Sequence, residues 1–323
     1  MDRRTFIGAL AAAGAVPLLA GCDPETGNNT SSDGKRKAVR VAQWGQERYL
    51  IYLPFYIAQA EDLFSKAGLD VTLSFSGNDD QVFAAVLRGD AQFGIGDPIF
   101  AAISRNRGAD GAVVGQIVGR IALWGVAKKG SKLLGAASDF ANLKIGTFPR
   151  PSTTYTLMRD MIDKNRVSGA RIVEVPIGSE AALLESGGAD VVMMLEPAAS
   201  IATSQGYDIV TSFPKLWGPF AFTGLTSTSS FVQGNRDVVA AMRSAMQSAL
   251  DLAHRNPARA TSVARALFPS LDAATVEAAV RRMLSEQTLP NRFAVDPASW
   301  AAAVRVRQAM GELGAGSYQD VIA

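Results

Sequence analysis

Hydrophobic and polar positions show two periodicities along the chain, and segments with one alternate with segments with the other as far as residue 235. Strict alternation and short apolar runs predict strands, whereas apolar residues three and four positions apart predict helices. The predicted strands are 38–44, 69–75, 91–96, 113–127, 143–148, 171–175 and 189–195. The predicted helices are 54–67, 79–88, 152–164, 179–185 and 197–205. This exchange of strand and helix is typical of α/β domains built on mostly parallel sheets.

One sequence motif occurs in each half of this region. Gly89 is followed by an apolar strand, Asp97 and a proline, and Gly188 is followed at the same spacing by an apolar strand, Glu196 and a proline. A proline suits the first turn of a helix, where its missing N–H would be unpaired anyway. Together with the matching order of strands and helices, the motif predicts two related lobes.

The last part of the chain has only helical spacing. Its predicted helices are 236–256, 258–267, 272–286 and 296–313, with prolines at the breaks between them. Met242, Met246 and Leu250 lie four positions apart, which is the spacing of one packed helix face. We interpret them as core residues rather than as metal ligands.

The first residues are typical of a targeting segment. Arg3 and Arg4 precede an apolar run that is too short to span a membrane comfortably, and they resemble the twin-arginine export signal. The sequence L-A-G-C ending at Cys22 resembles the bacterial lipobox, whose cysteine carries the lipid. We therefore expect an export signal at 1–21 and a lipidated flexible tether at 22–37, which is almost free of apolar residues. The mature protein would be lipid-anchored on the periplasmic or cell-surface side of a bacterial membrane.

The amino-acid composition limits the classes of function that this protein could have. Thirty-two Lys and Arg against 30 Asp and Glu leave a charge of +2, too balanced for a protein that binds nucleic acid by charge. One cysteine excludes a disulfide framework, and the single histidine, His254, lies in the helical tail. A phosphate loop or nucleophile motif in its required context is absent from the sequence. We expect a binding protein with no catalytic residue, no metal site and no cofactor, although paired carboxylates leave hydrolysis open on residue types alone.

A ligand site is expected where the strands end, because open α/β sheets bind ligands at the carboxyl ends of their strands. The candidates that follow predicted strands, or precede the return to the first lobe, are Trp44, Gln46, Gly77, Asn78, Asp97, Arg120, Arg150, Ser152, Thr153, Thr154, Glu196 and Phe220.

Each candidate has a structural alternative. Residues 152–154 could cap a helix or present hydroxyl and N–H groups to an anion. Asp97 and Glu196 could complement the positive ends of the helices that follow them, or accept hydrogen bonds from a ligand. Arg120 and Arg150 are solvated surface charges or anion clamps, and Trp44 is a stacking wall or an ordinary core residue. The basic and hydroxyl groups favour a sulfonate or carboxylate, the acidic and aromatic groups favour a neutral or cationic ring, and a zwitterion would satisfy both sets.

Four segments carry a resemblance to a known family. The stretches 53–58 (LPFYIA), 63–71 (LFSKAGLDV), 87–94 (LRGDAQFG) and 96–101 (GDPIFA) resemble blocks of periplasmic ABC-transporter solute-binding proteins. The subgroup is that for nitrate, sulfonates, taurine and thiamine-pyrimidine precursors. The likeness covers residues 38–230, and it departs at Glu61-Asp62, where the family usually has a glycine before the phenylalanine.

The resemblance implies the type II periplasmic-binding-protein fold, with two α/β lobes, a ligand cleft between them and a helical tail. Lobe 1 would comprise 38–125 and 223–323, and lobe 2 would comprise 126–222, with crossing segments near 124–127 and 221–225. It also implies a monomeric protein that closes around a small polar organic solute. The closed form would deliver that solute to a membrane permease driven by an ATPase.

Two other functions stay open at this point. Eukaryotic relatives make the thiamine pyrimidine with bound pyridoxal phosphate and their own histidine, but here the only histidine lies in the tail. A membrane-tethered sensor that presents its ligand to a receptor has the same sequence features as a transport protein.

Overall fold

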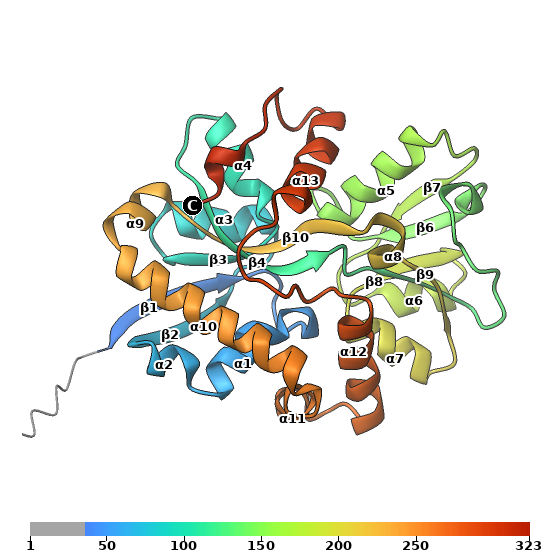
Figure 1. Ribbon diagram of the computed structural model, residues 1–323. Coiled ribbons are helices and arrows are strands. Elements are labelled where there is room, and N and C mark those ends of the chain that lie inside the picture. The colour runs from blue at the N-terminus through green and yellow to red at the C-terminus, as the bar shows by residue number, and fades with distance from the viewer. Residues whose placement is uncertain (1–35) are drawn as a thin grey trace, which may run out of the picture. The chain divides into compact units, whose positions relative to one another are not determined.

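The computed structural model describes residues 36–323, whose strands form two five-stranded sheets (Figure 1). The first sheet contains, in spatial order, β2 (Leu69–Phe75), β1 (Lys37–Gln43), β3 (Phe93–Gly96), β10 (Pro219–Ser227) and β4 (Ala112–Arg120). The second contains β7 (Arg171–Glu174), β6 (Lys144–Thr147), β8 (Val191–Met194), β5 (Trp124–Ala127) and β9 (Asp208–Ser212). The expected export signal with Arg3 and Arg4, the expected lipid attachment at Cys22 and nearly all of the expected tether lie outside the described residues.

The two sheets have the same pattern of strand directions. In each, the first three strands are parallel, and the fourth, β10 or β5, is antiparallel to both of its neighbours. Asp97 follows β3 and Glu196 closely follows β8, which are the third strands of their sheets. The prediction of two related α/β lobes is confirmed, and the repeated glycine–acid–proline motif occupies the same place in both.

The crossings between the lobes lie a few residues from where we expected them. Residues 121–123 connect β4 to β5, and Gly218 connects the end of the second lobe to β10. The stretch 124–127 is β5 itself, because it pairs along its whole length with β8 and β9. The stretch 221–225 lies inside β10, which already pairs with β4 from Pro219 onward.

Helices fill the connections between strands. The first lobe has η1 (Leu50–Tyr52), α1 (Leu53–Ala60), α2 (Leu63–Lys66), α3 (Asp79–Leu87), α4 (Ile99–Asn106) and α9 (Ser229–Gly234). The second lobe has η2 (Ala137–Phe140), α5 (Thr153–Lys164), α6 (Glu180–Glu185), α7 (Ala198–Ser204) and α8 (Phe213–Trp217). The single helix predicted at 54–67 is in fact two, because Asp62 has a left-handed backbone with φ of 56°, which ends one helix before the next begins.

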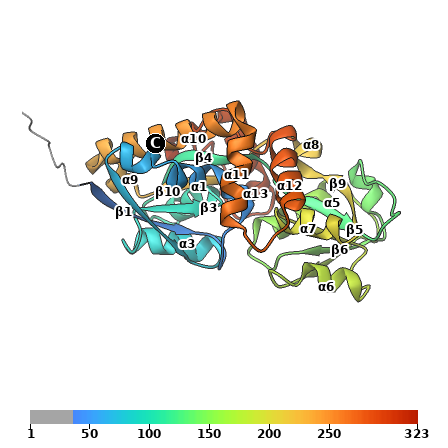
Figure 2. The same cartoon turned by 90° about the horizontal axis from the view of Figure 1, so that it is seen from below.

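The helical tail contains α10 (Arg236–Arg255), α11 (Pro257–Leu267), α12 (Ala273–Ser285), α13 (Pro297–Ala309) and η3 (Gln319–Val321). Side chains cap three of these starts: Asn256, Asp272 and Asp296 each accept a backbone N–H three residues on. The tail packs on both lobes (Figure 2): α10 and α11 lie on α1, α12 on α7, and α13 on both β10 and α5.

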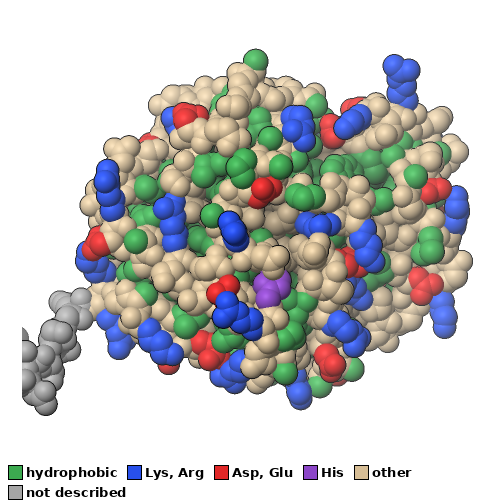
Figure 3. Space-filling view, in the orientation of Figure 1, with side chains coloured by type: hydrophobic (Ala, Val, Ile, Leu, Met, Phe, Trp, Pro, Cys, Tyr) green, Lys and Arg blue, Asp and Glu red, His purple; other side chains and the backbone are tan. Residues whose placement is uncertain are grey.

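The core runs through both lobes and the tail. Trp124, Trp300, Tyr56 and Phe55 are among the largest fully buried side chains. Met242, Met246 and Leu250 are also fully buried on one face of α10, which confirms their packing role. Within the described part of the chain, none of the helices has the length and apolar character needed to cross a bilayer. On the face drawn in Figure 3, basic and acidic side chains are intermixed.

Candidate ligand site

A small cavity lies where strand ends of the two lobes meet. Lobe 1 contributes Trp44, Ile51, Tyr52, Asp79, Asp97, Phe222 and Thr223. Lobe 2 contributes Phe148, Ser152, Thr153, Thr154 and Leu195. The cavity volume is about 30 Å³, which suffices for one or two water molecules. A neighbouring recess of about 10 Å³ shares several of these residues and adds Asn78. A solute larger than water therefore enters only when the two lobes move apart.

Two aromatic side chains in the cavity wall, one from each lobe, lie next to each other. Trp44 follows β1 and lies 6.0 Å from Phe148, which follows β6, as measured between ring centroids. Trp44 also packs edge-on against Tyr49, with 4.8 Å between the two ring centroids. Gly45 lets the chain turn here, with φ of 93°, and a Cβ at that position would lie 2.5 Å from the Tyr49 ring. The local turn thus holds Trp44 as a wall of the cavity.

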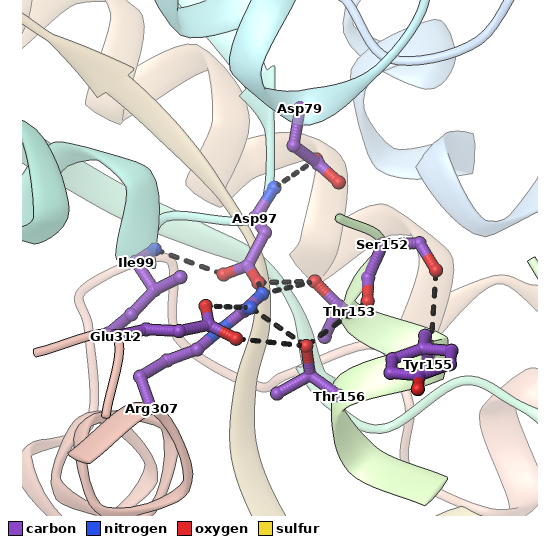
Figure 4. A network of polar contacts seen from close by, with 9 residues as sticks. All are labelled: Asp79, Asp97, Ile99, Ser152, Thr153, Tyr155, Thr156, Arg307 and Glu312. Carbon is purple, nitrogen blue, oxygen red and sulfur yellow. Dashed lines mark hydrogen bonds and ion pairs between the residues drawn. The ribbon is translucent and has the colours of Figure 1, made fainter. Parts of the chain in front are cut away.

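Asp97 is held by an arginine from the tail (Figure 4). Its Oδ1 accepts the N–H of Ile99 at 3.0 Å, as expected for an acid at the start of a helix. Its Oδ2 accepts Nη2 of Arg307 at 2.8 Å and also the hydroxyl of Thr153. The side chains of Asp97 and Arg307 are 4% and 3% exposed, so this ion pair is almost entirely buried.

Arg307 joins the two lobes. From α13 it also donates Nη1 to the Thr156 hydroxyl at 3.0 Å and to Glu312 Oε2 at 2.6 Å. Thr153 and Thr156 belong to α5 in lobe 2, whereas Asp97 belongs to lobe 1. The negative charge of Asp97 is therefore already compensated by this network.

Asp79, the first residue of α3, presents a second carboxyl group to the cavity. Its Oδ1 accepts the N–H of Asp97 at 2.7 Å. A Cβ on residue 96 would lie 2.7 Å from this oxygen, so Gly96 makes room for the carboxyl group. Among residues 36–323, the other oxygen, Oδ2, has no hydrogen-bond partner. Burial and the neighbouring Asp97 raise the pKa of Asp79 to about 7.

Tyr52 lies beside these groups. Burial, together with the negative charge of Asp79, raises the pKa of the Tyr52 phenol well above its ordinary value. The phenol therefore keeps its proton throughout the neutral range and can donate a hydrogen bond to a neighbour.

Glu196 is not a wall of the cavity, contrary to the expectation that it could accept hydrogen bonds from a ligand. It is fully buried. It accepts the N–H and the hydroxyl of Ser200, each at 3.1 Å, and forms an ion pair with Arg282 of α12. Burial raises the pKa of Glu196 in spite of that arginine. Its two oxygens are occupied by the helix that it precedes and by the tail.

The hydroxyl groups at the start of α5 cap the helix and lie at the cavity. Ser152 accepts the N–H of Tyr155 at 3.2 Å as a helix cap and donates to the carbonyl of Phe148 at 2.9 Å. Ser152, Thr153 and Thr154 also line the cavity.

The two arginines expected as anion clamps lie outside the cavity. Arg120 donates to the carbonyl of Pro214 at 3.0 Å and to Gln287 at 2.6 Å. It lies beyond the cavity because β4 continues past Gln116, the residue level with the end of β3. Arg150 has a side chain that is 67% exposed and pairs with Glu174 at 2.9 Å.

Three other candidates support the cavity or lie apart from it. Gly77 has φ of 80° and exchanges backbone hydrogen bonds with Gly45, which shapes the turn behind Trp44. Gln46 is exposed, and Phe220 is buried near the crossing. Phe222, two residues further along β10, lines the cavity instead.

Sequence reasoning missed one of the two carboxyl groups of the cavity, Asp79, and the arginine that pairs with the other, Arg307. Asp79 had a usable signal, since it follows the carboxyl end of a predicted strand and opens the predicted helix 79–88. Arg307 had none, because it lies 210 residues from Asp97 in a helix assigned to the tail.

The comparisons agree with this architecture. The model of the family described as NMT1/THI5 like matches residues 51–260. YtlA of Bacillus subtilis (strain 168), which its name gives only as a candidate binding protein, is 21% identical over 274 residues, or 82% of this chain and 81% of its own. The alkanesulfonate-binding protein SsuA of Xanthomonas axonopodis pv. citri superposes with a TM-score of 0.68 at 16% identity, covering 90% of this chain and 99% of its own. The periplasmic nitrate-binding protein NrtA of Synechocystis PCC 6803 gives 0.67 at 12% identity, covering 89% and 84%.

The fold is thus that of the two-lobed periplasmic binding proteins, as expected. The chain belongs to the NMT1/THI5-like family, because the family model covers more than half of it.

Proposed function

We propose that this protein is the solute-binding component of an ABC importer and captures a small polar organic solute between its lobes. The observation that carries the proposal is the cavity at the strand ends, whose walls come from both lobes. Contacts from both walls exist only when the lobes are together. A bound solute therefore shifts the equilibrium toward the closed form, which a permease can distinguish from the open form.

The export and anchoring steps of this proposal rest on the sequence. The twin-arginine-like Arg3 and Arg4 and the lipobox ending at Cys22 support export and a lipid anchor. The polar stretch that follows Cys22 supports a tether long enough for a monomeric binding domain to reach a permease in the same membrane. Replacement of Cys22 by Ser should release the protein from the membrane fraction. Retention of that variant would contradict the lipid anchor but not solute binding.

A thermal-shift screen of the exported protein tests solute binding. The panel contains sulfonates, thiamine precursors, nucleobases, amino acids and inorganic anions. Ligand at 100 times its Kd adds about 2.7 kcal/mol to the free energy of unfolding, a shift of several degrees for a chain of this size. Trp44→Ala should abolish the shift, whereas Trp217→Ala, which alters a tryptophan outside the cavity, should keep it. An unshifted wild-type protein across the panel would contradict the proposal.

Transport and sensing differ in what a deletion does. Loss of the chain should abolish uptake of the identified solute if the protein serves an importer. Normal uptake together with a lost cellular response to the solute would instead indicate a sensor.

A further inference from the structure

The cavity has an excess of negative charge. Its charged walls are Asp79 and Asp97. Arg307 forms ion pairs with Asp97 and Glu312, and its other hydrogen bonds go to hydroxyl groups of α5 rather than to Asp79. Oδ2 of Asp79 has no partner within residues 36–323.

Cationic side chains do not line this cavity in the described part of the chain. Arg120 and Arg150, the two that could have clamped an anion, are engaged elsewhere. An anionic solute would therefore lie next to the carboxyl group of Asp79, with no cationic side chain in the cavity wall to offset the repulsion. Such a contact is unfavourable in a site from which water is largely excluded.

The other walls suit a cation. Trp44, Tyr52, Phe148 and Phe222 contribute aromatic rings, whose faces carry partial negative charge and attract ammonium and guanidinium groups. The hydroxyl groups of Ser152 and Thr154 can accept further N–H donors.

We propose that the solute is a cation of the amine, amidine or protonated nitrogen-ring type, and that one of its N–H groups donates to Oδ2 of Asp79 while its body packs against Trp44 and Phe148. This inference rests on the proposed solute-binding function. It names Asp79 as the residue that selects the charge of the solute.

The titration behaviour of Asp79 supports this role. A carboxyl group whose pKa is raised to about 7 is only partly ionised at neutral pH, and a bound cation favours its ionised form. The groups that act on it are Asp97 and Asp80, which favour the protonated form, and Arg307, which favours the ionised form. Tyr52 stays neutral beside it.

Three probes of nearly equal shape and different charge test the inference: benzylamine, benzyl alcohol and benzenesulfonate. Binding is measured by calorimetry with the exported protein at pH 8. We expect benzylamine to bind at least about tenfold more tightly than the other two, because only its ammonium group can donate a charged hydrogen bond to Asp79. Asp79→Asn should remove this advantage. Asp80→Asn, which neutralises an exposed carboxylate on the same turn of α3, should preserve it.

A second measurement needs no variant. Benzylamine stays protonated between pH 6 and pH 8, whereas Asp79 with a pKa of about 7 ionises over this range. The Kd of benzylamine should therefore fall roughly tenfold as the pH rises from 6 to 8. The Kd of benzyl alcohol should not change. Asp79→Asn keeps the oxygen that accepts the Asp97 N–H, so we expect it to fold, and circular dichroism checks this.

The three possible failures can be told apart. Tighter binding of benzenesulfonate than of benzylamine by the wild-type protein would overturn the assignment of a cationic solute and leave solute binding intact. Equal affinities for benzylamine in the wild type and in Asp79→Asn would overturn the role of Asp79. If none of the three probes binds, and the panel described above is also silent, the proposed function itself fails.

Discussion

The ends of β3 and β8 carry the same sequence motif, but the acidic residues of the two copies have different surroundings. Asp97 and Glu196 both cap the start of a helix, and both form ion pairs with an arginine of the tail. Asp97 lines the cavity, and its arginine also contacts the opposite lobe. Glu196 is buried away from the cavity, and its arginine donates hydrogen bonds to Glu196 and Ser200, both of lobe 2. The repeated motif therefore marks the same place in both sheets, but only its copy in lobe 1 lines the cavity.

The largest effect should come from breaking the pair at β3. Arg307→Met leaves Asp97 buried without a counter-charge, and the removal of one partner of a buried pair costs about 3–5 kcal/mol. Urea unfolding at pH 7.5 measures this cost. Arg305→Met, at an exposed position of the same helix, is the control and should change the free energy of unfolding little. A small effect of Arg307→Met would mean that the tail does not hold the two lobes together.

The matching change at β8 should cost less. Arg282 is 18% exposed, and Glu196 can take up a proton once its partner is gone. We expect Arg282→Met to cost about 2 kcal/mol at pH 8. The cost should shrink at pH 5, because the raised pKa of the folded carboxyl means that protonation now favours the folded state. Arg281→Met is the exposed control. A cost independent of pH would contradict this account.

Asp79→Asn should change stability in the opposite direction. The pKa of Asp79 is higher in the folded protein than in the unfolded chain, so the wild type loses stability as the pH rises from about 4 to about 7. The amide does not titrate. Without ligand, the variant should exceed the wild type by about 1 kcal/mol at pH 8, a modest gain because the carboxyl group is only half-buried, and should match it at pH 4. Thermal unfolding at the two pH values measures the difference, and a variant less stable at pH 8 would contradict it.

The smallest effect on stability is expected for Arg150, which we predicted from the sequence as a ligand-site residue. Arg150→Ala removes an ion pair on the surface and should change stability by less than about 0.5 kcal/mol. Its affinity for the identified solute should equal that of the wild type. A loss of affinity would show that Arg150 swings into the cavity when a ligand is present.

Local sequence patterns were enough to predict most of the strands and helices. Strand β2 begins and ends at the predicted residues, and α3 begins at the predicted Asp79, because alternation and a helix-capping segment are signals that neighbouring residues provide. Strand β9 and helix α8 were missed. The break at Asp62 was missed because a left-handed aspartate leaves no strong trace in a helical pattern.

The site was predictable only in part. The rule of strand ends correctly located Trp44, Asp97 and residues 152–154 at the cavity. It could not tell which charges would be compensated, because that depends on Arg307 and Arg282, which approach from helices packed over the lobes late in the sequence. Pairings over such separations come from tertiary packing, which hydrophobic periodicity does not encode.

The chain's passage from lobe 1 to lobe 2 and back has a consequence during synthesis. The strands of the second sheet, between residues 124 and 212, are contiguous along the chain. The first sheet lacks β10, which lies between β3 and β4, until residue 227 has been made, and Asp97 lacks its arginine until residue 307. Because domains generally fold as units during translation, the second lobe can complete its sheet on the ribosome while the first is still waiting. The lobe that is begun first is therefore finished last.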